Sequence, residues 1–302
     1  MVCSVFFCTS YGILEIMQKK RRKIVVIGGG TGTFTVLTGL KKYPVDLTAI
    51  VSMADDGGST GILRDELGVL PPGDVRQCLV ALSKSDRLMR RLMQYRFTSG
   101  GLKGHTFGNI FLSALEKLTG SFDEAVEKAA EILRLRGTVI PATLTKTKLV
   151  AYLNNGIVLR GQHLISVSDL SWLKKVSLKP AAKANPKALR AIRDADYIVV
   201  GPGDVYSSII PHFLIADLAR TVADSKAIKI YVCNLMNRAG QTDNFSPRDY
   251  LETAERYSKA RFQYVIYNTE NPKLQLLKRY MREGEHPVAT RVIRQRRFIG
   301  GK

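Results

Sequence analysis

The stretch from Lys23 to Leu40 constrains the fold more than any other part of the sequence. Lys23 to Ile27 is a short run rich in β-branched residues that stops at a glycine, which is typical of a buried parallel strand entering a turn. After the turn, Phe34, Leu37 and Leu40 recur at helical spacing. The pattern therefore predicts a strand, a glycine turn and a helix in that order.

A second apolar stretch, Leu47 to Met53, follows this helix and completes a βαβ unit. Because such crossovers are right-handed, the carboxyl ends of both strands are expected at one edge of the sheet. Residues 138 to 166, with an Asn154-Asn155-Gly156 turn, indicate antiparallel hairpins. The sequence thus predicts an α/β fold with a mostly parallel sheet, with a further helix at Ala188 to Ala195 and strands at Tyr197 to Val200, Ile228 to Cys233 and Tyr264 to Tyr267.

The apolar period changes between Asp74 and Arg136. Apolar side chains there fit amphipathic helices, which predicts a helical insertion over about residues 75 to 136. The residues that carry this pattern are Leu79, Leu82, Leu88, Leu92, Ile110, Leu112, Leu115 and Leu118.

Charge and cysteine usage limit the classes of function. The 302-residue chain has 46 Lys plus Arg against 26 Asp plus Glu, a formal net charge of +20 that attracts polyanions. The basic residues are spread along the chain, and no zinc-finger, RNA-binding or helix-turn-helix pattern accompanies them, so a nucleic-acid partner is the least favoured alternative. No apolar run reaches the roughly 18 residues of a membrane span. Unpaired cysteines at positions 3, 8, 78 and 233 indicate a reducing compartment, and we expect a cytoplasmic protein.

The glycine turn after the first strand is a candidate phosphate site, because free backbone N–H groups and the helix dipole favour a phosphate there. It lacks the third glycine of the dinucleotide fingerprint and the Lys-Ser/Thr pair of a P-loop, and a tight turn without ligand is the alternative. The residues concerned are Gly28, Gly29, Gly30, Thr31, Gly32 and Thr33.

The second strand delivers Asp55 and Asp56 to the same edge, followed by Gly57, Gly58 and Ser59. Paired acids beside a phosphate loop suggest a ribose or a metal, since Mg²⁺ is usually held by one or two carboxylates plus substrate phosphates. The alternative is an ordinary Asp-Gly turn with Ser59 capping the next helix.

Three later motifs add polar groups at equivalent places in the chain. In the first motif, a Pro-Pro-Gly turn presents an acid and an arginine before a helix, and the next motif places a histidine and an amide between glycines. In the third, another glycine loop joins a strand to a helix. This loop, and an amide after the following strand, would face the same crevice at the edge of the sheet as the first glycine turn. The alternatives are a capped helix with an internal ion pair, a plain hydrogen-bonding histidine and an ordinary connection. The candidates are Asp74, Arg76, His105, Asn109, Gly201, Pro202, Gly203, Tyr206, Ser207 and Asn234.

Five blocks in order, GGGTGT, SMADDGGSTGILRDELGVLPPGDVRQCLVAL, GHTFGN, GPGDVYSSIIP and YVCNLMNRAGQTDNFS, closely resemble the CofD/YvcK-like family over residues 23 to about 287. The match is nearer to the YvcK branch, the gluconeogenesis factors, than to the phospholactate transferases. The resemblance implies a Rossmann-like three-layer sandwich, a nucleotide-sugar ligand such as UDP-N-acetylglucosamine, and a role in cell shape during growth on gluconeogenic carbon. Our regulator hypothesis adds cell-envelope or metabolic protein partners, and a homo-oligomer and a monomer are both open alternatives.

The transferase branch is implied to move phospholactate onto a deazaflavin alcohol with magnesium, using the glycine loop, the Asp55-Asp56 pair and the Gly-Pro-Gly loop. Two departures from that branch stand out. Residues 237 to 241 read Asn-Arg-Ala-Gly-Gln in place of a stretch resembling Thr-Gln-Pro-Gly-Glu, and Tyr250 stands where histidine is expected. A ligand-sensing regulator without a catalytic nucleophile is therefore our leading hypothesis, and a magnesium-dependent phosphotransferase is the alternative.

Both ends of the chain differ from the central domain at residues 23 to 287. Residues 1 to 22 form an extension whose apolar part precedes its basic run, the reverse of a secretory signal, and we interpret Met17 as the start of the protein proper. Residues 288 to 302 form a basic tail that does not resemble the last segment of the family.

Overall fold

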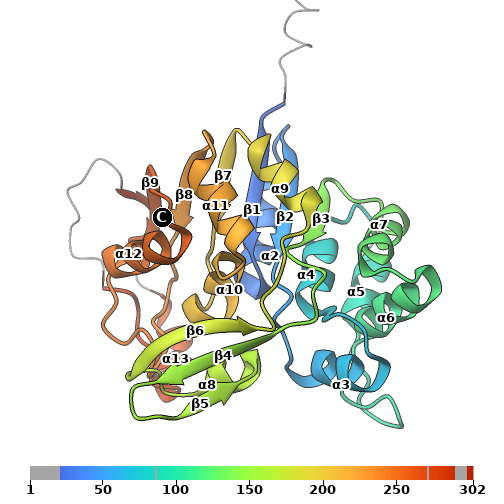
Figure 1. The fold of residues 1–302 in the computed structure, drawn as a ribbon, viewed down its shortest axis with the longest axis horizontal. Coiled ribbons are helices and arrows are strands. Elements are labelled where there is room, and N and C mark those ends of the chain that lie inside the picture. Colours follow the sequence, from blue (N-terminus) through green and yellow to red (C-terminus); the bar gives the residue numbers. More distant parts are fainter. Residues whose placement is uncertain (1–20, 86, 271, 290–297, 302) are drawn as a thin grey trace, which may run out of the picture.

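A computed structural model describes residues 21–85, 87–270, 272–289 and 298–301. Its main element is a seven-stranded sheet with the order β10-β9-β8-β7-β1-β2-β3, in which all neighbouring strands are parallel (Figure 1). This confirms the predicted α/β class. The strands are β1 (Lys23–Gly28), β2 (Asp46–Val51), β3 (Thr138–Pro141), β7 (Tyr197–Val200), β8 (Ile228–Val232), β9 (Tyr264–Asn268) and β10 (Phe298–Gly301).

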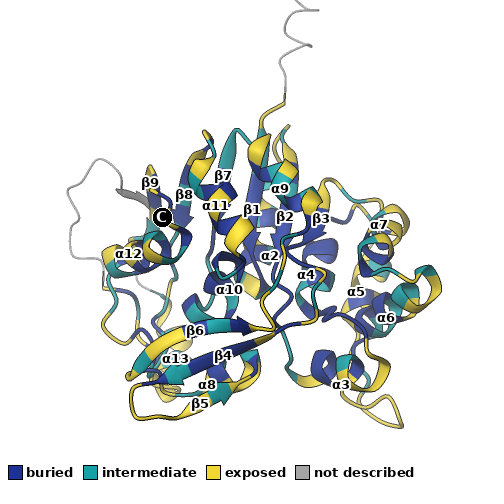
Figure 2. Ribbon diagram, viewed as in Figure 1, coloured by how far each residue is buried: buried dark blue, intermediate teal, exposed yellow. Residues whose placement is uncertain are grey.

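The central strands are buried on both faces, which explains their continuous apolar sequences. In β1, Val25 and Ile27 belong to one hydrophobic cluster and Val26 to the other, because successive side chains of a strand point to opposite faces. Figure 2 shows this centre in dark blue. The sheet is therefore the middle layer of the three-layer sandwich that the family resemblance implied.

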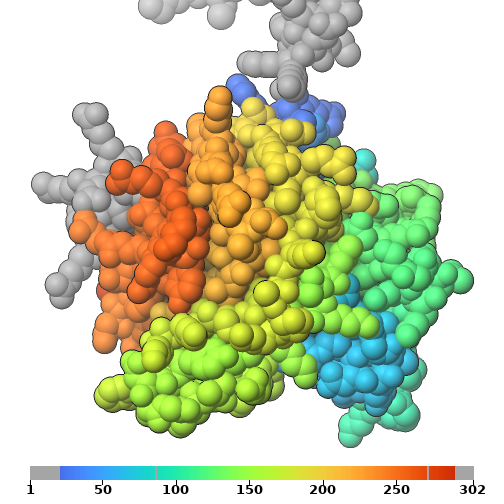
Figure 3. Space-filling view, viewed as in Figure 1, coloured from blue at the N-terminus to red at the C-terminus, as the bar shows by residue number. Residues whose placement is uncertain are grey.

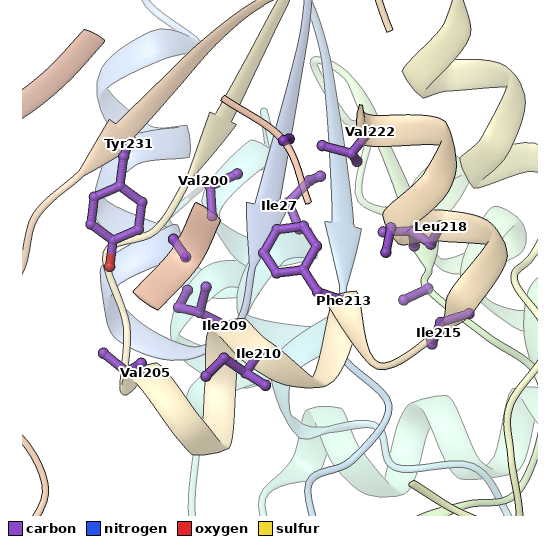
Figure 4. Close-up of a cluster of buried hydrophobic side chains, with 14 of the residues drawn as sticks. Ile27, Val200, Val205, Ile209, Ile210, Phe213, Ile215, Leu218, Val222 and Tyr231 are labelled. Carbon is purple, nitrogen blue, oxygen red and sulfur yellow. The ribbon is translucent and has the colours of Figure 1, made fainter. Parts of the chain in front are cut away.

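One face of the sheet is covered by helices from the second half of the chain. Figure 4 shows side chains of this layer, among them Ile209, Phe213 and Leu218, beside Ile27 and Val200 of the sheet. Helix α12 (Pro247–Ser258) begins at a Ser246 capping box, with Pro247 in its first turn. The layer comprises α9 (Pro186–Arg193), a π-helical turn (Val205–Ile209), α10 (Ile210–Phe213), α11 (Ala216–Asp224) and α12 (Pro247–Ser258).

The other face carries α2 (Gly30–Leu40) and the predicted helical insertion. Leu79, Leu82 and Leu112 are fully buried there, as expected. Three further members of the predicted apolar pattern are on the surface, since Leu88 is 72%, Leu92 is 38% and Leu118 is 82% exposed. Periodicity identified their helices correctly but not the sides that pack. The predicted insertion comprises α4 (Gly73–Leu82), α5 (Arg87–Gln94), α6 (Phe107–Thr119) and α7 (Phe122–Ile132), and α3 (Gly58–Leu67) precedes it in the chain.

A small antiparallel sheet lies at the carboxyl ends of the main strands, at the bottom of Figure 1. It contains β4 (Lys148–Leu153), β5 (Val158–Arg160) and β6 (Leu173–Lys179), in the spatial order β5-β4-β6. Helix α8 (Gln162–Val167) lies between β5 and β6 in the chain. The Asn154-Asn155-Gly156 turn joins β4 to β5, as predicted. In the space-filling view this layer adjoins α3, drawn in light blue (Figure 3).

The layer on the α2 face is incomplete over the later strands. A groove of about 590 Å³ opens between α2 and strands β7 to β9, and Ile266 on its floor is 39% exposed. Helix α13 (Leu274–Arg282) buries none of its side chains. Among the described residues, no helix combines the length and apolar character needed to cross a membrane.

Two segments, one at each end of the chain, were predicted to lie outside the central domain, and the structure describes part of the C-terminal one. The proposed extension, including the Met17 start, lies almost entirely in residues 1–20, outside the described part of the chain. In the predicted basic tail, Phe298–Gly301 forms β10 and pairs in parallel with β9. The tail therefore contributes an edge strand to the sheet.

Candidate functional site

The two glycine loops that the sequence predicts separately meet at the carboxyl edge of the sheet. One follows β1 and begins α2, and the other follows β7. A β-carbon at Gly32 would collide with the backbone carbonyl of Pro202, so glycine lets the loops touch. Gly30 has a φ of +67°, which a β-branched residue rarely adopts.

Asp74 in the first turn of α4 lies directly against the first loop. The Gly30 backbone N–H donates a hydrogen bond of 3.0 Å to Asp74 Oδ1. A β-carbon at Gly29 would collide with the same carboxyl group. Burial raises the pKa of Asp74 to about 7, and the negative charge of Asp55 is the second cause of that rise. The carboxyl group therefore accepts a proton readily near neutral pH.

The two predicted acids after β2 have different surroundings. Asp55 accepts a hydrogen bond from the Gly57 N–H at 3.0 Å, and burial raises its pKa. Asp56 instead accepts a 2.8 Å bond from the His163 N–H of α8 and lies 3.9 Å from Arg64 Nη1. The acid that influences Asp74 is thus Asp55, while Asp56 ties α8 to α3.

Residues of three separate motifs form one buried hydrogen-bond network. Arg76 Nε donates to Asn109 Oδ1 at 2.9 Å, and Asn109 Nδ2 donates to Ser59 Oγ at 3.2 Å. Ser59 Oγ also lies 3.2 Å from His105 Nδ1. The alternative interpretation, an Asp74–Arg76 ion pair, is not among the salt bridges of the described residues, and Arg76 instead donates to Asn109. The network joins α3, α4 and α6 beside the glycine loop.

Two residues that were not among the predicted ligand-binding residues belong to this region. Thr60 Oγ1 lies 3.5 Å from Asn109 Nδ2, and it also hydrogen-bonds Asp55. Its hydroxyl stands next to Ser59 in the motif, which is the signal that could have identified it. Arg64 lies one helical turn after Thr60 in α3, and no sequence feature marks it as part of the site.

The second glycine loop is held by the strand next to it. The Gly203 N–H donates to Asn234 Oδ1 at 3.2 Å, and Asn234 Nδ2 donates back to the Gly203 carbonyl at 3.0 Å. Ser207 is buried, and its hydroxyl donates to Asp204 at 3.5 Å. Tyr206 is partly buried near Tyr257 of α12. Asn234 and Ser207 therefore support the loop that Gly201 and Pro202 present at the edge, whereas Tyr206 packs on the α12 side.

The departures from the transferase pattern form internal supports. Gln241 Nε2 donates to three backbone carbonyls at the end of α8, at distances of 2.9 to 3.2 Å. The Tyr250 hydroxyl lies 3.0 Å from Asn237 Oδ1 and 2.9 Å from Thr242 Oγ1. Gln241 thus ties its loop to α8 of the small layer, and Tyr250 holds the loop itself in place.

Metal binding at this edge would depend on the ligand. Within the described ranges, no group of three His, Cys, Asp or Glu side chains is arranged to hold a metal ion. Asp55 and Asp74 offer carboxylate oxygens, which suit magnesium when substrate phosphates complete its coordination. The predicted metal pair Asp55-Asp56 is less suitable because Asp56 is engaged by His163 and Arg64.

Comparison with known proteins identifies the family. The family model described as 2-phospho-L-lactate transferase CofD matches residues 24–298. The chain belongs to the CofD family. The match runs through most of the described chain, including the start of β10.

Members of the CofD family that are similar to this chain carry the name gluconeogenesis factor. One from Thermoanaerobacterium thermosulfurigenes, named as a candidate gluconeogenesis factor, is 45% identical over 88% of this chain and 84% of its own length. The Listeria innocua gluconeogenesis factor is 41% identical over 86% of this chain and 81% of its own. A crystal structure of a upf0052 family protein from Bacillus halodurans aligns with a TM-score of 0.85 and 38% identity, covering 89% and 87% of the two chains.

Proposed function

We propose that this CofD-family protein binds a UDP-sugar at the carboxyl edge of the sheet and acts as a cytoplasmic regulator of the gluconeogenesis-factor type, needed for cell shape during gluconeogenic growth. The contact between the two glycine loops at Gly32 and Pro202 carries the proposal. Adjacent glycine loops offer backbone N–H groups to neighbouring phosphates, and a nucleotide sugar contains a diphosphate.

A regulatory role is favoured because the polar side chains of the site are engaged with one another. The Ser59–His105 contact resembles a nucleophile with its base. Ser59 is only 5% exposed, however, and it also accepts a hydrogen bond from Asn109. This arrangement joins α3 to α6 and leaves the serine no open approach. Binding of the sugar would then change the surface offered to cell-envelope or metabolic partners.

A magnesium-dependent phosphotransferase is the second candidate, and the nearby carboxyl groups Asp55 and Asp74 favour it. When bound, magnesium would neutralise charge on a transferring phosphate. Asp55 and Asp74 would hold the ion, and the glycine loops would orient the phosphates. Both carboxyl groups have raised pKa values from burial, so a nearby cation would favour their ionised forms.

Titration with UDP-N-acetylglucosamine, GDP and a deazaflavin alcohol, each with and without magnesium, distinguishes the two candidates. Calorimetry reports binding, and product analysis reports turnover. We expect tight UDP-sugar binding without a product. Transfer of a phosphate-containing group to the deazaflavin alcohol would establish the enzyme instead, and failure of every nucleotide to bind would refute both candidates.

A further inference from the structure

Helix α3 and the segment after it also line a second cleft of about 480 Å³, which none of the predicted nucleotide-binding residues lines. We name it the basic cleft. Its residues come from α3, the loop after it, the start of β4 and the end of β6. They are Arg64, Asp65, Leu70, Pro71, Lys146, Thr147, Lys148, Lys179 and Pro180.

Positive charge dominates the basic cleft, because its lining contains four cationic side chains and one carboxylate. Lys148 and Lys179 are directly opposite each other in the β4–β6 register. Like charges in that position destabilise a sheet, because the side chains are close neighbours. Among the described residues, neither lysine forms a salt bridge. An anion between the two ammonium groups would remove this repulsion.

Arg64 at the inner wall has unused hydrogen-bonding capacity. Its side chain is 13% exposed, and its Nη1 atom is buried without a hydrogen-bond partner. The nearest carboxylate oxygen, on Asp56, is 3.9 Å away, while Nε is paired with Asp65 at 3.3 Å. A buried guanidinium nitrogen without a partner is unfavourable, and a phosphate oxygen is a well-matched acceptor. Because Nη1 is buried near Asp56, the guanidinium would have to turn toward the cleft to reach a ligand there.

We propose that the basic cleft is a second ligand site, for a small organic phosphate carrying at least two negative charges. Its volume lies within the roughly 300 to 1,000 Å³ that is typical of small-molecule sites. Leu70, Pro71 and Pro180 supply an apolar part for the carbon skeleton of such a ligand. The cations converge on one cleft from separated segments, which suits a compact ligand better than the extended backbone of a nucleic acid.

The two sites share α3, and the ligands are therefore expected to influence each other. Arg64 of the basic cleft approaches Asp56, which directly follows Asp55 of the carboxyl edge. Ser59 and Thr60, in the first turn of the same helix, belong to the network beside the glycine loop. Any change that one ligand makes in the affinity of the other must be reciprocal.

Inorganic pyrophosphate is a suitable probe, measured by calorimetry on the full chain at an ionic strength near the physiological 0.15 M. The test variant is Lys148→Gln with Lys179→Gln. The matched control, Lys103→Gln with Lys174→Gln, removes the same charge from exposed lysines outside the cleft. We expect the test variant to weaken pyrophosphate binding at least about tenfold and the control less than about twofold.

Equal affinity of the two variants would overturn the proposal, because attraction by the general positive charge alone would then explain binding. Failure of the native protein to bind either pyrophosphate or a bisphosphorylated sugar would also overturn it. A third variant, Gly30→Val, separates this proposal from the nucleotide site: it should lose UDP-sugar binding and keep pyrophosphate binding. Loss of both ligands in a folded Gly30→Val protein would place pyrophosphate at the glycine loops and refute the basic cleft.

Discussion

The carboxyl-edge site and the basic cleft share a helix but are built in opposite ways. At the carboxyl edge, backbone loops touch where only glycine fits, and hydrogen bonds hold the polar side chains. In the basic cleft, long cationic side chains from distant segments converge without ion pairs at Lys148 and Lys179. The first site is preorganised by its backbone, whereas the second depends on an anion to organise it.

The largest effect is expected from Gly30→Val. The φ of +67° disfavours a β-branched residue, and the new side chain would point beside Asp74 into the expected phosphate position. We predict that UDP-sugar affinity falls by at least about a hundredfold, which corresponds to roughly 2.7 kcal/mol. Gly39→Val is the matched control, because a β-carbon there has nothing within 4 Å. Calorimetry should show near-native affinity for the control, and equal affinity in the Gly30 variant would refute the phosphate loop.

Replacement of both Asp55 and Asp74 by Asn tests what these two acids hold. If they orient a ribose, UDP-sugar affinity should fall by on the order of 1 to 3 kcal/mol, equally with magnesium and with a chelator. We expect this result. Asp56→Asn is the control, since an amide oxygen can still accept the bond from the His163 N–H. A loss that occurs only with magnesium, together with loss of turnover, would favour the transferase.

The pH dependence of stability tests the burial of Asp74. Because its pKa is raised from 3.8 to about 7, the native state retains a proton that the unfolded chain loses over this range. The contribution of Asp74 to the free energy of unfolding should therefore fall as pH rises from 3.8 to about 7. Asp74→Asn should reduce this slope and stabilise the protein above pH 7 by on the order of 1 to 3 kcal/mol. Denaturant titrations at several pH values measure the effect, and an unchanged slope would contradict it.

The smallest effect concerns the basic cleft without its ligand. Lys148→Gln with Lys179→Gln should raise the free energy of unfolding by about 0.2 to 1 kcal/mol, because it removes two opposed charges. The control pair at Lys103 and Lys174 should not show this gain. Urea unfolding without phosphate in the buffer distinguishes them, and destabilisation of the test variant would show that the lysines are not repelling each other.

Sequence periodicity predicted the sheet well because its strands are buried on both faces. The predicted strand at Tyr197 to Val200 has the bounds of β7, and the hairpin at Asn154 to Gly156 is present. The glycine loops were predicted to share one edge because parallel strands place their carboxyl ends together, and Gly32 does meet Pro202.

Features that depend on side-chain direction could not be predicted in the same way. Nothing in the Asp-Asp sequence indicates that Asp56 turns toward His163 while the charge of Asp55 acts on Asp74. The exposure of Leu88 depends on which side of a short helix packs. Likewise, the meeting of Lys148 and Lys179 depends on the register of two strands separated by a hairpin and a helix.

Backbone amide NMR of the full chain during titration with UDP-N-acetylglucosamine tests the central claim most directly. The proposal predicts saturable shifts at Gly29 to Gly32 and Gly201 to Gly203, the two glycine loops that meet at Gly32 and Pro202. Subsequent addition of pyrophosphate should shift amides at Lys146 to Lys148 and at Lys179. If UDP-N-acetylglucosamine instead shifts the basic cleft and leaves both glycine loops unchanged, the assignment of the nucleotide to the carboxyl edge is wrong.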